Sequence, residues 1–202
     1  MEVRVRCHRP FDKENFSWGE YAENNGFVCI HPRNLVNSHE GTAYEWLPVF
    51  DLGYTGGAME VIRLPKNRDS NNSLNTNTIK RNNAWLDYSF DTYTSAAPKV
   101  TVYTIPSQPL NNNFSMRYGV SVDDGPVNIV DFKTVGRSDE WKENVLRNRA
   151  ERTIQLPHLN KGHHTLKIYA IDPGVILDEI RIDLGGLKKA YSTIPASTPR
   201  NK

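Results

Sequence analysis

The stretch from Gly162 to Leu187, GHHTLKIYAIDPGVILDEIRIDLGGL, decides the fold class, because it places two alternating strands on either side of an Asp-Pro-Gly turn. Apolar residues occupy every second position of both strands: Leu166, Ile168 and Ala170, then Ile176, Ile180 and Ile182. This alternation is typical of half-buried antiparallel strands, so we predict a β-hairpin. Asp178 shares the face of the three isoleucines, and a buried carboxylate there needs a charged or hydrogen-bonding partner.

Strands are predicted elsewhere from the same alternation or from β-branched runs that end at proline: 27–30, 58–64, 85–93, 100–105, 118–122 and 129–132. In the third of these, Leu86, Tyr88 and Phe90 should face the core, as should Tyr118 in the fifth. The residues between the first two strands read as a loop rich in glycine and aromatics, and 65–83 as a long, exposed, asparagine-rich loop.

One helix is predicted, over 138–152, with Ser138 or Asp139 as its N-cap. Its apolar residues, Trp141, Val145 and Leu146, should face the sheet. At 202 residues, one domain is expected. We predict an all-β chain: a polar arm over 1–25, an antiparallel, jelly-roll-like β-sandwich with one short helix over 26–190, and an extended tail over 191–202.

Charge and hydropathy argue against two classes of partner. Twenty-five basic and 23 acidic residues are interspersed along the chain, which leaves no basic stripe for nucleic acid. No apolar run approaches the roughly 20 residues that cross a bilayer, and the N-terminal MEVRVRCHRP lacks the apolar centre of a signal peptide. Of the two cysteines, Cys29 should be buried in the strand FVCI, while Cys7 lies in the polar arm; a disulfide between them stays open.

Three segments resemble, in order and spacing, the C-terminal domain of glycoside hydrolase family 115, whose members are xylan α-1,2-glucuronidases. They are the closing stretch, AWLDYSFDTYTSAAPKVTVYTIPSQPLNNNFSMRYGVSVDDG at 84–125, and SDEWKENVLRNRAERT at 138–153. The resemblance is specific from Trp85 to Pro195 and looser from Gly26 to Leu64. There FVCIHPRN stands where the family tends to have an acidic FVSIEAEH-like strand, and LGYTGGAMEV resembles its glycine-rich turn.

The resemblance implies a β-sandwich like that of carbohydrate-binding modules, acting as an accessory domain in xylan degradation. Its expected partners are xylan, in particular glucuronoxylan, or a related plant polysaccharide, the catalytic domain of a parent enzyme, and a second copy in a homodimer. An enzyme of this kind is secreted, so the expected location is extracellular or periplasmic. The family's separate catalytic domain has no counterpart in this sequence, and we therefore expect no hydrolase activity here.

The residues themselves agree with a non-catalytic domain. Asp123, Asp124 and Asp172 sit at predicted turns, where aspartate commonly bonds local backbone. The sequence contains no G-x-S-x-G motif, and His163 and His164 have no further ligand at metal spacing, so a surface role is favoured for them. We predict no catalytic residues, no metal ligands and no cofactor.

Structural calcium is the cofactor that needs weighing. Many sandwich carbohydrate-binding modules hold calcium with carboxylates of their first and last strands. Here the first strand leads into His31, Pro32, Arg33 and Asn34, so Asp178 lacks an acidic partner. We favour a buried ion pair between Asp178 and Arg33 over calcium.

A carbohydrate site would need an aromatic platform with polar groups beside it. Two clusters qualify: Tyr44, Trp46 and Tyr54 in the glycine-bearing loop, and Trp85 with Asp87 on the face opposite the core. The competing interpretation is that Trp46 plugs one end of the sandwich and Trp85 packs under a loop or the arm. Three functions follow: a packing domain, a glycan-binding module and, least favoured, an independent esterase or hydrolase.

Overall fold

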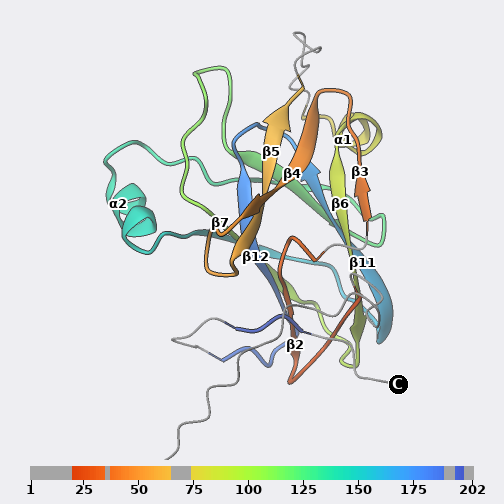
Figure 1. The fold of residues 1–202 in the computed structure, drawn as a ribbon. Coiled ribbons are helices and arrows are strands. Elements are labelled where there is room, and N and C mark those ends of the chain that lie inside the picture. The colour runs from red at the N-terminus through yellow and green to blue at the C-terminus, as the bar shows by residue number, and fades with distance from the viewer. Residues whose placement is uncertain (1–19, 35–36, 65–73, 189–193, 198–202) are drawn as a thin grey trace, which may run out of the picture.

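The described residues of the computed structural model, 20–34, 37–64, 74–188 and 194–197, form a β-sandwich of two facing sheets (Figure 1). The first sheet has the order β1 (Glu20–Ala22), β6 (Trp85–Thr92), β11 (Gly162–Ala170), β8 (Arg117–Val122) and β9 (Asn128–Asp131), with β3 (Asn37–His39) also paired to β6. The second has the order β10 (Ala150–Gln155), β7 (Lys99–Thr104), β12 (Ile176–Asp183), β5 (Gly57–Arg63) and β4 (Tyr44–Phe50), with β2 (Phe27–Ile30) on β12. Only β1 on β6 is a parallel pair among these strands. The predicted all-β sandwich is confirmed.

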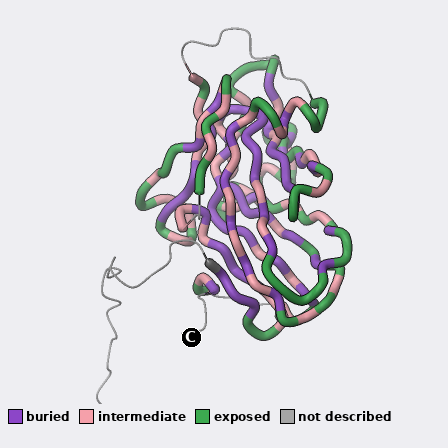
Figure 2. The backbone as a smooth tube through the Cα atoms, turned by 90° about the vertical axis from the view of Figure 1, so that its right-hand side faces the viewer, coloured by how far each residue is buried: buried purple, intermediate pink, exposed green. Residues whose placement is uncertain are grey.

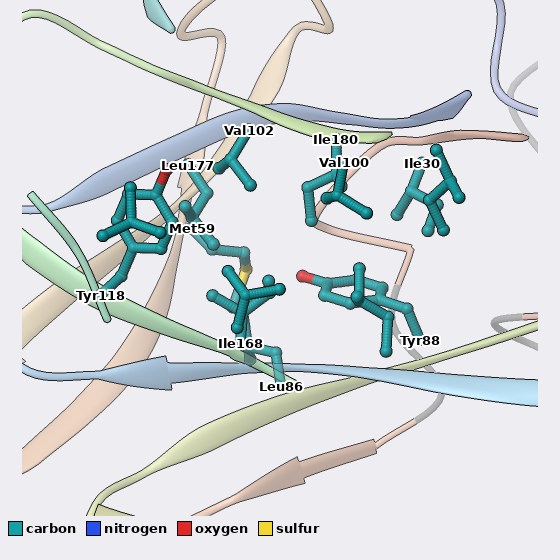
Figure 3. Packing of buried hydrophobic residues seen from close by; sticks show 14 of the residues in the cluster. Ile30, Met59, Leu86, Tyr88, Val100, Val102, Tyr118, Ile168, Leu177 and Ile180 are labelled. Atoms are coloured by element: carbon teal, nitrogen blue, oxygen red, sulfur yellow. The ribbon is translucent and has the colours of Figure 1, made fainter. Parts of the chain in front are cut away.

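The core lies between the sheets and follows the predicted alternation. Figure 3 shows Ile30, Val100 and Ile180 of the second sheet pointing toward Leu86, Tyr88 and Ile168 of the first. The four side chains predicted for the core on β6 and β8 are buried: Leu86, Tyr88, Phe90 and Tyr118. Burial alternates along the strands, while the turns at both ends are largely exposed (Figure 2).

The predicted hairpin of the closing stretch is wrong. β11 pairs with β6 and β8 in the first sheet, whereas β12 pairs with β2, β5 and β7 in the second. The Asp-Pro-Gly segment therefore crosses from one sheet to the other. Asp172 anchors this crossing: its carboxylate accepts hydrogen bonds from the backbone N–H and the guanidinium of Arg117 at 2.5–3.0 Å. Alternation reveals that each strand has one buried face, but a facing pair of strands shows the same pattern as a hydrogen-bonded pair.

The predicted position of Asp178 is also wrong in one respect. The register of β12 shifts between Leu177 and Glu179, as at a β-bulge, so Leu177 faces the core before the shift and Ile180 after it. Asp178 is fully buried, as predicted, but it binds the backbone of the β4–β5 turn instead of lying among the isoleucines.

The remaining differences concern elements that the sequence did not reveal. β4 lies within the segment predicted as a loop, and α1 (Thr76–Asn82) within the asparagine-rich segment, whose residues 65–73 lie outside the description. The predicted helix is shorter: α2 (Asp139–Leu146) begins after its predicted N-cap Ser138, whose Oγ accepts the N–H of Trp141 at 3.2 Å. No residue of α2 is buried, and it lies to the side of the sheets in Figure 1, so its apolar residues do not face a sheet.

Both ends of the sandwich reach further than predicted. β1 pairs with β6, and Tyr21 on it is buried and donates its hydroxyl to the carbonyl oxygen of Asn34 at 2.6 Å. Near the C-terminus, Ser197 bonds to both backbone groups of Cys29, at 2.8 and 2.9 Å. Cys29 is buried as expected. Residues 1–19, including Cys7, lie outside the described part, so the question of a disulfide between Cys7 and Cys29 stays open. Neither helix in the described ranges has the length and hydropathy of a membrane span.

Candidate functional site

The aromatic residues proposed as a sugar platform divide into buried and exposed ones. Tyr44 and Trp46, on β4, belong to the core and keep only 3% and 7% of their surface exposed, so they present no face to a ligand. This agrees with the competing interpretation of Trp46 as a plug. Tyr54, in the turn between β4 and β5, is 49% exposed, and the neighbouring Phe50 is 63% exposed. The first cluster therefore reduces to the tip of this hairpin.

The backbone of the hairpin tip is held by the carboxylate of Asp178. It accepts the N–H groups of Tyr54 and Thr55, each at 3.1 Å, and the Thr55 hydroxyl at 3.1 Å. Gly53 allows this close approach, because its φ is +79° and a Cβ there would lie 2.2 Å from Asp178 Oδ1. The exposed Tyr54 is thus carried by a turn fixed from below by a buried acid.

Arg149 provides the positive charge for this buried acid. One guanidinium nitrogen, Nη2, lies 3.0 Å from Asp178 Oδ2 and 2.6 Å from Glu179 Oε2, and both carboxylates are fully buried. The guanidinium carbon lies 4.4 Å from the centre of the Tyr54 ring and 4.2 Å from that of Tyr103. The arginine therefore joins two carboxylates and stacks against two aromatic rings, one of which is the exposed Tyr54.

Further groups complete the cluster around Glu179. Arg181 Nε donates to Glu179 Oε1, which also accepts the Cys29 thiol at 3.4 Å. Burial, and then the negative charge of Glu179, raise the pKa of the Cys29 thiol well above its usual range. Burial likewise raises the pKa of the Tyr103 hydroxyl, and the nearby Arg181 opposes this. At neutral pH both groups are therefore uncharged, and the arginines neutralise the two carboxylates.

The predicted ion pair between Asp178 and Arg33 is wrong, although Asp178 does pair with another arginine, Arg149. Arg33 lies over the Phe50 ring, with its guanidinium carbon 4.1 Å from the ring centre, and packs where a Cβ on Gly57 would be. Arg149 takes the expected role. Sequence reasoning missed it because 138–152 was interpreted as one helix, whereas Asn148 has a φ of +48° just beyond α2 and Arg149 leads into β10.

The second predicted cluster lies on the outer face of the first sheet. Trp85 is half-buried: the His39 ring stacks on it at 4.2 Å between centroids, and Tyr169 and the α1 residue Ile79 form a small apolar cluster beside it. Asp87 binds His39, with Oδ2 3.0 Å from Nε2. Trp85 thus packs beneath local structure, as the competing interpretation expected, while it remains next to polar groups.

The other acids considered at the sequence level have specific partners. They pair as follows: Asp91 with His163, Asp123 with His164, Asp124 with Lys167, and Asp172 with Arg117. The hydrogen bond from Lys167 and its charge lower the pKa of Asp124. Asp172 is fully buried and binds across the structure, so its predicted local turn role is wrong. Among the described residues, no three His, Cys, Asp or Glu side chains converge as metal ligands would.

Residues 20–196 match the family model described as the glycosyl hydrolase family 115 C-terminal domain. The chain belongs to this family. A similar solved structure is that of a family GH115 4-O-methyl-alpha-glucuronidase, BtGH115A, with specificity for decorated arabinogalactans. It is 30% identical, with a TM-score of 0.53, and the match covers 73% of this chain. This family 115 domain corresponds to 17% of that enzyme's length.

Two carbohydrate-binding modules are also similar. The C-terminal CBM6 of a laminarinase from Zobellia galactanivorans is 11% identical with a TM-score of 0.47, over 78% of this chain and 98% of that module. A family 35 module from Clostridium thermocellum is 14% identical with a TM-score of 0.46, over 77% and 96%. At these values neither likeness bears on the ligand of this chain. No match was found among the curated proteins.

Proposed function

We propose that this domain is a non-catalytic accessory module that binds a plant polysaccharide carrying glucuronic acid, and that Tyr54 is its main contact. The exposure of Tyr54 on a rigidly held turn is the observation that supports this proposal. Its backbone is bound by Asp178, its ring is stacked on Arg149, and its hydroxyl donates to the carbonyl oxygen of Arg147 at 2.6 Å. An aromatic ring fixed in this way loses little entropy when a sugar stacks on it.

Family membership supports the ligand class. The family's printed description concerns a domain of glycosyl hydrolases, and the similar glucuronidase is specific for decorated arabinogalactans. The sequence resemblance points instead to glucuronoxylan. Both polymers carry glucuronic acid side groups, so we propose the shared chemistry and let the experiment separate the two sources. An enzyme acting on such polymers works outside the cytoplasm, which is the location we propose for this domain.

Affinity gel electrophoresis tests the proposal, with glucuronoxylan, arabinogalactan and an unrelated glucan as the polymers. We expect retardation by at least one of the first two, and Tyr54→Ala should reduce it about tenfold, the effect of one aromatic stacking contact. Tyr93→Ala is the matched control, because Tyr93 is 51% exposed and follows β6 in the other sheet. Equal retardation of both variants would contradict the assignment of Tyr54, and no retardation by any polymer would contradict binding.

A packing role is the second candidate, and the exposed surface of α2 favours it. Leu146 and Val145 on this helix are 83% and 49% exposed, and Val135 just before it is 78% exposed. Exposed apolar side chains on this helix and just before it are typical of an interface. In this alternative the helix packs against the catalytic domain of a parent enzyme or a second copy of the domain. Analytical ultracentrifugation of the domain, alone and with that catalytic domain, would detect either complex, and Leu146→Ser should weaken it.

A further inference from the structure

The side chain of His39 covers the Trp85 ring on the outer face of the first sheet. The two residues are directly opposite each other in the β3–β6 pair. Their rings are nearly parallel, at 17°, with centroids 4.2 Å apart. β3 has three residues and lies at the edge of the sheet, and the His39 side chain is 38% exposed. Rotation of this side chain into solvent would free the face of the Trp85 ring on which it stacks, while Tyr169 and Ile79 would keep the rest of the indole packed.

Two polar atoms lie unpaired beneath this histidine. Trp85 Nε1 is a buried donor and Asp87 Oδ1 a buried acceptor, and neither has a hydrogen-bond partner in the described part of the chain. Residues two apart on a strand point to the same face, so both side chains project from the outer face of the sheet. Buried polar groups without partners are rare and costly, so these two atoms call for an explanation.

We propose that Trp85 and Asp87 form a second sugar subsite, which His39 occupies in this structure in place of a pyranose ring. The imidazole stacks on the indole where the C–H face of a sugar would lie, and its Nε2 binds Asp87 where a hydroxyl would donate. With His39 turned away, Asp87 accepts a hydroxyl of the sugar that stacks on the indole. The ligand class is thus a pyranoside with a free hydroxyl group beside its stacked face.

Lys167 completes the polar border of this subsite. Its Nζ lies 5.7 Å from the centre of the Trp85 ring and binds Asp124 Oδ1 at 2.5 Å. Because His39 competes with the sugar, the apparent affinity equals the intrinsic affinity multiplied by the fraction of molecules in which the indole is uncovered. The subsite rests on the proposed function only for its ligand class, because Tyr54 lies in the β4–β5 turn of the second sheet and Trp85 on β6 of the first.

The test is a gain of affinity. In calorimetric titrations with xylotetraose, His39→Ala should bind about tenfold more tightly than the wild type, the effect of removing one stacked, hydrogen-bonded competitor. His39→Phe is the matched control: it keeps a ring over Trp85 and should show no gain. Adding Asp87→Ala to His39→Ala should abolish the gain. Melting curves of all variants would verify that each is folded before titration.

Repeating the titrations in a Tyr54→Ala background separates the two proposals. A gain from His39→Ala in that background supports the subsite even if the wild type binds no polysaccharide, which would contradict the proposed function alone. If His39→Ala binds no more tightly than its parent in either background, the subsite is overturned and His39 is a cross-strand packing residue. An equal gain from His39→Phe would also overturn it, because the indole would still be covered.

Discussion

Replacing Arg149 by methionine should destabilise the domain strongly, because this arginine neutralises two carboxylates that have no access to solvent. In this variant Asp178 would still accept hydrogen bonds from the N–H groups of Tyr54 and Thr55, and Glu179 would still pair with Arg181. Breaking a buried pair by removing one partner typically costs 3–5 kcal/mol. Since both acids retain other donors, we expect a loss of about 3 kcal/mol in the free energy of unfolding, or a melting temperature lower by about 6–12 °C.

Urea denaturation followed by tryptophan fluorescence measures this loss, and two variants give its scale. Arg149→Lys keeps the charge but loses the planar guanidinium that lies against the Tyr54 and Tyr103 rings, so about 1–2 kcal/mol should be lost. Arg147→Met removes an ion pair with Glu143 in which both side chains are more than half exposed, so the change should stay below about 0.5 kcal/mol.

A double variant tests the reason for the loss. Asp178→Asn removes one of the buried negative charges, so Arg149→Met should cost about 1–2 kcal/mol less in that background than in the wild type. Additive effects, or a loss below about 1 kcal/mol for Arg149→Met alone, would refute the view that this arginine is the counterion of the buried acids.

Four further outcomes follow from the geometry. Asp172→Asn should cost about 2–3 kcal/mol in urea denaturation, because it leaves the partly buried Arg117 without its counterion; a change below about 0.5 kcal/mol would contradict this. Burial keeps the Cys29 thiol protonated, so in a Cys7→Ser background a disulfide reagent at pH 8 should react at the unfolding rate and no faster. Because the pKa of this thiol is higher in the folded than in the unfolded chain, the free energy of unfolding should fall as the pH rises above about 8.5. Because a guanidinium already neutralises the buried carboxylates, neither calcium nor a chelator should shift the melting temperature, and a calcium-dependent shift would argue against that role. Tyr54→Phe, which loses the bond to Arg147 but keeps the ring, should retain polysaccharide affinity within about threefold, and a loss equal to that of Tyr54→Ala would show that the hydroxyl makes the contact.

β6 was predicted correctly because its two faces differ strongly in polarity. β6 places Leu86, Tyr88 and Phe90 inside and its acids outside, which leaves a single way to bury the strand. β4 escaped notice because its segment was interpreted as a loop rich in glycine and aromatics. The strand contains Pro48 and lies at the edge of the second sheet, where a proline is tolerated.

Topology was beyond the sequence for a different reason. The pattern of β11 and β12 predicts how much of each strand is buried, but not which strand lies beside it. The connection carries Ile171 and Val175, both of them buried, Val175 in the core between the sheets and Ile171 in the small cluster beside Trp85, whereas the residues of a hairpin turn usually stay at the surface. An apolar residue on each side of a turn is therefore more informative about a crossing than the turn itself.

The candidate site shows the same division between chemistry and geometry. The expectation that Asp178 is buried correctly called for a cation beside it, because a buried carboxylate is tolerated only with its charge compensated. Which cation serves depends on the loop that covers the carboxylate, and that depends on where α2 ends. Once Asn148 turns the chain, Arg149 enters the cluster and stacks on Tyr54. The residue that stabilises the buried acids thereby also orients the exposed ring, so stability and the proposed binding surface are coupled through one guanidinium.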